Sequence, residues 1–271
     1  MTERVITGLY VPGDRPDRFD KAVATGAGMI ILDLEDAVAP EAKPAALEAV
    51  TSWLRARASG SAAERPDENC VVQVRVNAGV DHEIVAVRDS GADVELRIPK
   101  VEHARDLDRV AEQAAGLPLT ALIETALGVE NAAAIAAHPA ATRVALGESD
   151  LASDIGTRDA LALDYARVRL LFAARAAGLP APMLSAYPDI RDLDGLRADT
   201  ERGRRLGWVG RTAIHPSQLA VIADVFAPTD AELDWARSVL AAVEAGGVAT
   251  LASGEMVDPA MLGRARSILG S

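Results

Sequence analysis

The segment MIILDLEDAV, residues 29–38, joins an apolar run to three carboxylates, Asp33, Glu35 and Asp36. The apolar run has the length and the aliphatic composition of a strand that is buried on both faces of a parallel sheet. Carboxylates at the end of a buried strand are costly unless they bind a partner or remain solvated. The segment therefore predicts a buried parallel strand that ends in a metal site, an acid–base pair or a solvated acidic loop.

Short apolar runs of this kind recur along the chain, and stretches with helical composition and spacing lie between them. The predicted strands cover residues 5–11, 29–34, 71–76, 94–99, 119–123, 143–146, 182–186 and 212–214. Eight strand–helix repeats are typical of a (β/α)8 TIM barrel. The rival α/β fold is an open doubly wound sheet, which usually carries a glycine-rich phosphate-binding sequence after its first strand. Residues 9–14, LYVPGD, contain a single glycine, which favours the barrel.

The composition fits one large α/β domain with a smaller extension. Of the 271 residues, 49% are hydrophobic and only 3% are aromatic, so the core must consist mainly of Ala, Val, Leu and Ile. The repeats end near residue 226, and a helix over about residues 230–245 and a final short helix follow them. We therefore expect a barrel over residues 1–226 and a C-terminal helical extension over residues 227–271.

Charge and cysteine content exclude several classes of function. The formal net charge is -12, which argues against binding nucleic acid through a general basic surface. The single cysteine forms no internal disulfide, so a reducing compartment is expected. The N-terminus lacks the apolar segment of a signal peptide, and no apolar run approaches the roughly 20 residues of a membrane span. We expect a soluble, cytoplasmic protein that uses neither nucleic acid nor a membrane as a partner.

Charged and polar side chains follow six of the predicted strands at the same end. They are Asp33, Glu35 and Asp36 after the second strand, Arg75 and Asn77 after the third, Lys100 after the fourth, Glu124 and Thr125 after the fifth, Glu148, Ser149 and Asp150 after the sixth, and His215 after the eighth. Barrel enzymes carry their chemistry at the carboxyl ends of the strands. The joint pattern favours a catalytic mouth over a set of solvated loops.

Two of these carboxylates, Glu124 and Asp150, end neighbouring predicted strands and could share a metal ion. The sequence has no Cys or His cluster with zinc spacing, and the available ligands are hard oxygens. Such ligands suit Mg²⁺, and also Mn²⁺, with water and substrate filling the other positions. The alternative is that one carboxylate only pairs with Lys100 or Arg75.

Arg75 and His215 each allow two interpretations. The planar fork of Arg75 suits a substrate carboxylate or an oxyanion, but a structural salt bridge with Asp33 or Glu35 is the alternative. His215 could act as an acid, or it could be a buried, hydrogen-bonded structural residue. A divalent cation and a guanidinium that stabilise an oxyanion, with a carboxylate that moves a proton, suit a reaction that passes through an enolate.

Several longer motifs occur in a fixed order over nearly the whole chain. They are YVPGDRPDRF, LDLEDAV, VRVNA, IPKVE, LIETALGVENAAAIA, LGESDLASDIG, GRTAIHPSQL and, in the tail, GEMVD. Together they resemble the citrate lyase beta-subunit-like family within the HpcH/HpaI aldolase group. The resemblance implies a (β/α)8 barrel, Mg²⁺, lyase chemistry on coenzyme A or acyl-carrier thioesters, a C-terminal extension that acts as a lid, and a homotrimer or hexamer.

The resemblance also implies roles for individual residues. Glu124 and Asp150 match the metal ligands, and Glu124 lies at the substrate. Arg75 matches the arginine that holds the substrate's carboxylate or carbonyl group. Asp258 matches a lid aspartate that acts as acid and base from a neighbouring subunit. The segment that lies along the coenzyme corresponds to Pro12, Gly13, Arg15 and Lys21.

With the metal assigned to Glu124 and Asp150, the carboxylates of the opening segment become supporting groups. We expect Glu35 or Asp36 to bind metal-bound water or to orient Arg75 or Lys100, because such partners fix the groups that touch the metal.

The chain departs from the family pattern at Glu148 and Ser149, where the family usually has Ala-Glu, and at Arg211, where it usually has Lys. These changes put the identity of the substrate in doubt more than the chemistry.

The expected activity is Mg²⁺-dependent cleavage or formation of a 3-hydroxyacyl-CoA thioester, with a 2-oxo acid and acetyl-CoA or another acyl-CoA on the other side. Malyl-, citramalyl- and citryl-CoA are substrates of this type. The alternatives are a metal-dependent 2-oxo acid aldolase without a thioester, a thioesterase, the lyase subunit of a multi-subunit citrate lyase complex, and a non-catalytic binding barrel.

Overall fold

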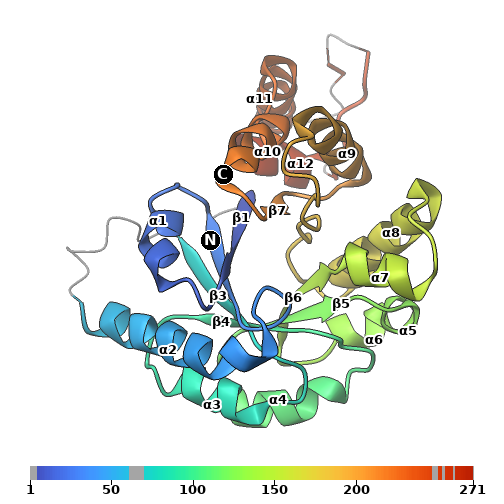
Figure 1. Cartoon of the computed structure of the whole chain (residues 1–271). Helices are drawn as coiled ribbons and strands as arrows, with labels where there is room; N and C mark the ends of the chain where they lie inside the picture. The colour runs from blue at the N-terminus through green and yellow to red at the C-terminus, as the bar shows by residue number, and fades with distance from the viewer. Residues whose placement is uncertain (1–4, 61–69, 246–249, 252–253, 259, 271) are drawn as a thin grey trace. The chain divides into compact units, whose positions relative to one another are not determined.

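A curled parallel sheet forms the centre of residues 1–226, which are the larger of two compact units (Figure 1). The computed structural model describes residues 5–60, 70–245, 250–251, 254–258 and 260–270. Within them the sheet has seven strands in the order β6-β5-β4-β3-β2-β1-β7. The strands are β1 (Thr7–Pro12), β2 (Met29–Asp33), β3 (Val71–Arg75), β4 (Glu95–Ile98), β5 (Leu119–Ile123), β6 (Ala141–Leu146) and β7 (Arg211–Ala213).

Helices follow the strands, and α2, α3 and α4 lie along the outer side of the sheet (Figure 1). The helices of this unit are α1 (Phe19–Val23), α2 (Lys43–Ser59), α3 (Asp81–Arg88), α4 (Asp106–Ala114), α5 (Ala126–Glu130), α6 (Ala132–Ala136), α7 (Glu148–Asp154), α8 (Ala160–Ala176), α9 (Leu193–Leu206) and α10 (Leu219–Phe226). Every residue of β2 and of β5 is buried. The aliphatic core expected from the composition therefore lies on both faces of the central strands.

The strand count corrects the sequence prediction. Of the predicted strand over residues 182–186, only Leu184 forms a bridge, parallel to Arg211. Its N–H donates to the Gly210 carbonyl at 2.9 Å, and its carbonyl accepts from the Thr212 N–H at 2.9 Å. Pro182, two residues earlier, has no N–H to extend this ladder. The fold is therefore a TIM-barrel-like α/β fold with seven strands in its described residues, where eight were predicted.

On its other side, the segment that contains Leu184 reaches β6 through a side chain. The Ser185 hydroxyl donates to the Leu146 carbonyl and accepts from the Glu148 N–H at 3.2 Å. The Ser185 hydroxyl thus replaces backbone ladder hydrogen bonds at the seam between the two edge strands, β6 and β7.

The second unit, residues 227–271, contains the two helices α11 (Asp230–Ala245) and α12 (Met261–Leu269) in its described part. Ala236, Val239 and Ala265 form a small buried cluster between these helices. The Asp258 side chain is exposed, and its carboxylate accepts from the Ala260 N–H at 2.8 Å just before α12.

Across the described residues, none of the helices combines the length and the apolarity that a membrane crossing requires.

Candidate active site

Glu124 follows β5 directly and is only 1% exposed. Contacts with Lys100 and Gly147 hold its side chain in place. Its Oε1 accepts from the Lys100 N–H at 2.8 Å. A Cβ atom added at Gly147 would lie 2.5 Å from the Glu124 Oε2 and 2.7 Å from its Cβ. Since such contacts are not tolerated, glycine is required at position 147, and the close approach of the backbone confines the carboxylate.

Asp150 lies in the first turn of α7, which begins directly after Gly147, and its negative charge acts on Glu124. Burial raises the pKa of Glu124 to about 8, against the opposing effect of the Lys100 N–H, and the negative charges of Glu35 and Asp150 act in the same direction. A cation bound by Glu124 and Asp150 would offset both the burial of Glu124 and the repulsion from the neighbouring negative charges.

The donor set of this pair fits Mg²⁺. In the part of the chain that the structure describes, no group of three or more His, Cys, Asp or Glu side chains is arranged to hold one ion. Mg²⁺ usually takes one or two protein carboxylates and keeps water and substrate oxygens as its other ligands. Glu124 and Asp150 offer such a pair of hard oxygens.

Lys100 connects the Glu124 carboxylate to Glu35. Its backbone is left-handed, with a φ of 55°, a conformation that costs a non-glycine residue about 1–3 kcal/mol and is concentrated at functional sites. In this conformation its N–H points at Glu124, while its Nζ lies 3.3 Å from the Glu35 Oε1. The negative charge of Glu35 raises the pKa of Lys100, so this lysine stays protonated.

Glu35 is buried between two cations. Its Oε2 lies 2.9 Å from the Arg75 Nη1, and its Oε1 faces Lys100. Both oxygens are buried, and within the described residues neither has a hydrogen bond of good geometry. Burial raises the pKa of Glu35, although the positive charge of Arg75 opposes this. Glu35 therefore contacts both of the cations that the sequence suggested it could orient.

Arg75 makes the structural salt bridge that was the alternative to a substrate contact. Its Nε and Nη2 donate to the two oxygens of Asp33 at 2.7 and 2.6 Å. Its Nη1 meets Glu35 at 2.9 Å and Asp36 at 3.2 Å, and the Tyr10 ring lies beneath the guanidinium at 5.2 Å. Most of its donors are thus engaged by the acidic segment, and its role toward a substrate stays a prediction.

A cavity of about 610 Å³ adjoins this cluster and includes Glu35, Asp36 and Lys100 in its lining. Asn77 on another wall accepts a hydrogen bond from Lys43 and donates through its Nδ2 to Glu83 at 2.8 Å.

Glu83 is a buried wall residue that the sequence did not identify. It lies in α3 beside the apolar Ile84, and it also accepts from the Asn77 N–H at 2.7 Å. A charged residue within an apolar helical pattern is its only sequence signal.

The segment expected to lie along the coenzyme begins at the end of β1. Gly13 is buried, and a Cβ atom there would lie 2.9 Å from the Asp33 carbonyl. Arg15 is exposed and pairs with Asp17 at 3.1 Å; Lys21 in α1 is exposed. Pro12 is half-buried. These residues stay a predicted coenzyme surface.

His215 is exposed rather than buried, and its Nδ1 accepts from the Ser217 N–H at 3.2 Å. It caps the short helical turn Pro216–Gln218, which corrects the interpretation of this residue as a buried structural histidine.

Known protein families and individual proteins match most of this chain. The family model HpcH/HpaI aldolase/citrate lyase matches residues 6–216, and a model for C–C bond lyases of the TIM-barrel fold matches residues 170–265. A (3S)-malyl-CoA thioesterase from Cereibacter sphaeroides is 41% identical over 87% of this chain and 82% of that relative. A citrate lyase subunit beta-like protein from Deinococcus radiodurans is 34% identical over 96% of this chain and 95% of that relative.

Among solved structures, protein CitE from Mycobacterium tuberculosis, in complex with magnesium, acetoacetate and coenzyme A, matches with a TM-score of 0.80 and 32% identity. The match covers 100% of this chain and 98% of that chain.

Proposed function

Because the chain belongs to the HpcH/HpaI aldolase/citrate lyase family, we propose that it cleaves or forms a 3-hydroxyacyl-CoA thioester in a Mg²⁺-dependent carbon–carbon lyase reaction. The products of cleavage are a 2-oxo acid and acetyl-CoA or another acyl-CoA. The chain is an enzyme of a lyase family, and one solved relative, CitE, contains magnesium and coenzyme A. The observation that carries the proposal is the burial of Glu124 against Gly147, at the start of the helix that carries Asp150.

The reaction needs one bond to break and one proton to change place. In the cleavage direction, the 3-hydroxyl group loses its proton and the bond between C2 and C3 breaks. The bonding electrons enter the thioester as an enolate, and the hydroxyl-bearing carbon leaves as the oxo carbon of the 2-oxo acid. The enolate carbon then takes up a proton and becomes the methyl group of acetyl-CoA, or the corresponding carbon of a longer acyl-CoA.

The chain's own residues supply most of what these steps require. Glu124 and Asp150 hold the metal, and Lys100 fixes Glu124 through its N–H. When bound, the cation supplies Lewis-acid stabilisation of the oxyanion charge that develops on the substrate. Arg75, which donates two hydrogen bonds to Asp33 from one edge of its guanidinium, adds positive charge at the same end of the sheet. Asp258, as a lid residue of a neighbouring subunit, donates the proton to the enolate carbon in cleavage and removes it in the reverse reaction.

Thioester hydrolysis is the second candidate function. It is favoured by the 41% identity to relatives named (3S)-malyl-CoA thioesterase, which exceeds the 34% identity to the citrate lyase subunit beta-like protein. Hydrolysis breaks the bond between the acyl carbon and sulfur, and water supplies the hydroxyl of the resulting acid. Free coenzyme A then appears and no 2-oxo acid is formed.

The proposal includes a cytoplasmic homotrimer or hexamer, as the family resemblance implies, with Asp258 contributed across subunits. Light scattering of the purified chain measures the oligomer size. Mixing an inactive Asp150→Ala chain with an inactive Asp258→Asn chain should restore part of the activity, because some sites then receive both intact residues.

An assay against a panel of thioesters tests the reaction. The purified chain is incubated with malyl-, citramalyl-, methylmalyl-, hydroxymethylglutaryl- and citryl-CoA, with Mg²⁺ and with EDTA. We expect a 2-oxo acid and an acyl-CoA in equal amounts from one of the first two or from citryl-CoA, and only with Mg²⁺. Free coenzyme A without a 2-oxo acid would show that the chain is a thioesterase and not a lyase. Cleavage of free 2-oxo acid aldols without any thioester would show that it is an aldolase and contradict both proposals.

A further inference from the structure

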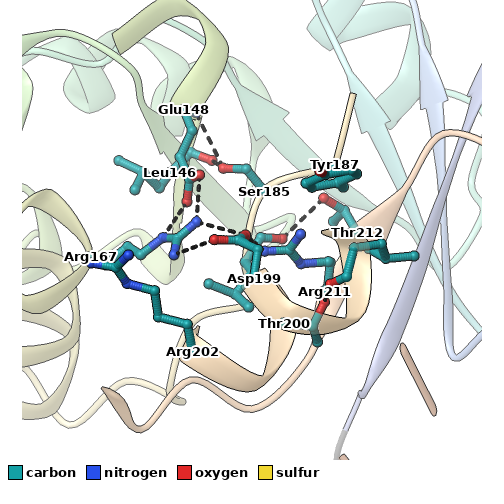
Figure 2. A network of polar contacts seen from close by, with 12 residues as sticks. Leu146, Glu148, Arg167, Ser185, Tyr187, Asp199, Thr200, Arg202, Arg211 and Thr212 are labelled. Carbon is teal, nitrogen blue, oxygen red and sulfur yellow. Dashed lines mark hydrogen bonds and ion pairs between the residues drawn. The ribbon is translucent and has the colours of Figure 1, made fainter. Parts of the chain in front are cut away.

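A network of ion pairs around two buried arginines, Arg167 and Arg211, lies at the seam between the edge strands β6 and β7, where the backbone ladder is interrupted (Figure 2). It links the start of α7 to α8, α9 and β7. Its charged members are Glu148, Asp164, Arg167, Asp199, Arg202 and Arg211. Three acidic groups balance three basic ones, so the network carries no net charge of its own.

Arg167 on α8 is the centre of this network and is only 2% exposed. Its Nε and Nη2 donate to the two oxygens of Glu148, both at 2.8 Å. Its Nη1 and Nη2 donate to the two oxygens of Asp199, both at 3.0 Å, and its Nη1 also reaches Asp164 at 3.4 Å. All five N–H donors of the guanidinium are therefore used. A lysine could not reproduce this planar double fork.

The Glu148 end of the network lies two residues from the metal pair. Glu148 begins α7, whose first turn carries Asp150. The preceding Gly147 is fixed by the hydrogen bond from its N–H to the Ile123 carbonyl at 2.8 Å, and Ser185 accepts from the Glu148 N–H. Figure 2 shows Glu148 between the Ser185 hydroxyl and the Arg167 guanidinium. The backbone of this turn and its first side chain are thus anchored from three sides.

From this arrangement we propose that Arg167 is a positioning residue for the metal site. Through its double hydrogen bond to Glu148 it fixes the first turn of α7, and so the direction in which Asp150 faces Glu124. This inference rests on the proposed function, because it assumes that Glu124 and Asp150 hold the metal.

Stability alone does not account for the network. Buried ion pairs cost desolvation, and apolar residues of similar volume often stabilise a fold as well or better. The network instead orients the start of α7 at this seam. On the side of β7 that faces the seam, Leu184 forms the one backbone bridge within the described residues. Groups that orient metal ligands act through such directional contacts, and their loss typically weakens metal binding or activity about 10- to 100-fold.

The test compares direct metal binding by two variants of the full chain. Glu148→Gln keeps the size of the side chain and one acceptor but loses the charged fork. Arg202→Met is the matched control, because Arg202 pairs with Asp164 at 2.5 Å and does not contact α7 in the described network. Calorimetric titration with Mg²⁺ or Mn²⁺, without substrate, gives the affinity, and the thermal midpoint gives the stability of each variant.

We expect Glu148→Gln to bind the ion at least about tenfold more weakly than the wild type. In assays its KM for Mg²⁺ should rise by a similar factor, while kcat at saturating Mg²⁺ changes little. Arg202→Met should lower the thermal midpoint and leave the affinity unchanged. Arg167→Lys, which retains the charge without the double fork, should behave like Glu148→Gln. Arg167→Met risks failing to fold and is not needed.

Three results would contradict the inference, and they differ in what else they contradict. If the wild type binds the ion and Glu148→Gln binds it equally well, Arg167 has only a structural role and the metal pair stands. If the wild type binds neither ion, the metal pair and the proposed lyase reaction fail together with the inference. A loss of affinity equal in Arg202→Met and Glu148→Gln would also show a general effect on folding rather than positioning.

Discussion

Replacing Gly147 by alanine should damage the metal site without removing any of its polar groups. The backbone at Gly147 is not left-handed, so alanine adds no strain of its own. Its Cβ would lie 2.5 Å from the Glu124 Oε2 and 2.7 Å from the Glu124 Cβ, distances at which one of the two must move. Rotation of the Glu124 side chain relieves the Oε2 contact, but its Cβ is fixed to the backbone, so the backbone of Glu124 must also shift from Gly147.

The size of the effect follows from the contact that Glu124 loses when it turns. Its carboxylate accepts from the Lys100 N–H at 2.8 Å in a buried site. A hydrogen bond to a charged group contributes about 1.5–3 kcal/mol. At about 1.4 kcal/mol per factor of ten, this corresponds to a roughly 10- to 150-fold weaker affinity for the metal. The thioester KM should change less, because the close contacts of the added methyl group are all with Glu124.

The assay is a calorimetric titration of Gly147→Ala with Mg²⁺, beside Gly28→Ala as the control. A Cβ atom at Gly28 would meet its nearest neighbour, a Val5 methyl, at an ordinary 3.5 Å. We expect Gly28→Ala to bind the ion like the wild type. If Gly147→Ala also binds Mg²⁺ like the wild type, then Glu124 is not a metal ligand that the backbone of Gly147 holds in place.

Three further predictions concern the site. Asp150→Ala should abolish Mg²⁺-dependent turnover while circular dichroism shows an intact fold; activity that persists in this variant and in EDTA would show that the metal is held elsewhere or is not needed. Asp258→Asn should remove turnover and spare Mg²⁺ binding, and normal turnover would refute the lid role. Burial raises the pKa of Glu124 from its ordinary 4.5 to about 8, so the stability that this group contributes to the metal-free chain is fully present below about pH 4.5 and lost as the pH rises through about 8. The thermal midpoint of the metal-free wild type should therefore fall across this range relative to Glu124→Gln, and Mg²⁺ affinity should rise with pH; parallel pH curves for the two chains would contradict the assignment.

The sequence predicted those parts of the fold that depend on local pattern. The apolar runs of β2 and β5 are buried along their whole length, so their composition alone identified them. Residues 182–186 have a similar composition but form only the Leu184 bridge. Composition does not show that Pro182 lacks the donor needed to extend the ladder toward β7, or that a serine hydroxyl replaces it toward β6.

The candidate site was predictable to the extent that strand ends converge. Glu124 and Asp150 were predicted as a pair because the carboxyl ends of neighbouring parallel strands lie close together, and their role as metal ligands stays a prediction. Arg167 was missed because the two partners of its double fork, Glu148 and Asp199, are 19 and 32 residues away in the chain. An arginine on the apolar face of a predicted helix is the sequence signal that could have indicated a buried ion pair.

The opening segment illustrates what geometry adds to a correctly predicted strand. Its carboxylates were identified as a cluster with three alternative roles. In the structure both oxygens of Asp33 accept from one edge of the Arg75 guanidinium, while Glu35 lies between Arg75 and Lys100. Which carboxylate engages which cation depends on the left-handed backbone of Lys100 and on β3 pairing with β2, and neither is encoded by a local pattern.

The central claim is that Glu124 and Asp150 hold the divalent cation on which the reaction depends. Titration of the full chain with Mn²⁺, followed by electron paramagnetic resonance of the free ion, tests it most directly. The wild type should bind one Mn²⁺ per chain above pH 8, and Asp150→Asn should lose that site while keeping the wild-type circular dichroism spectrum. A folded Asp150→Asn chain that binds one Mn²⁺ with unchanged affinity would contradict the claim.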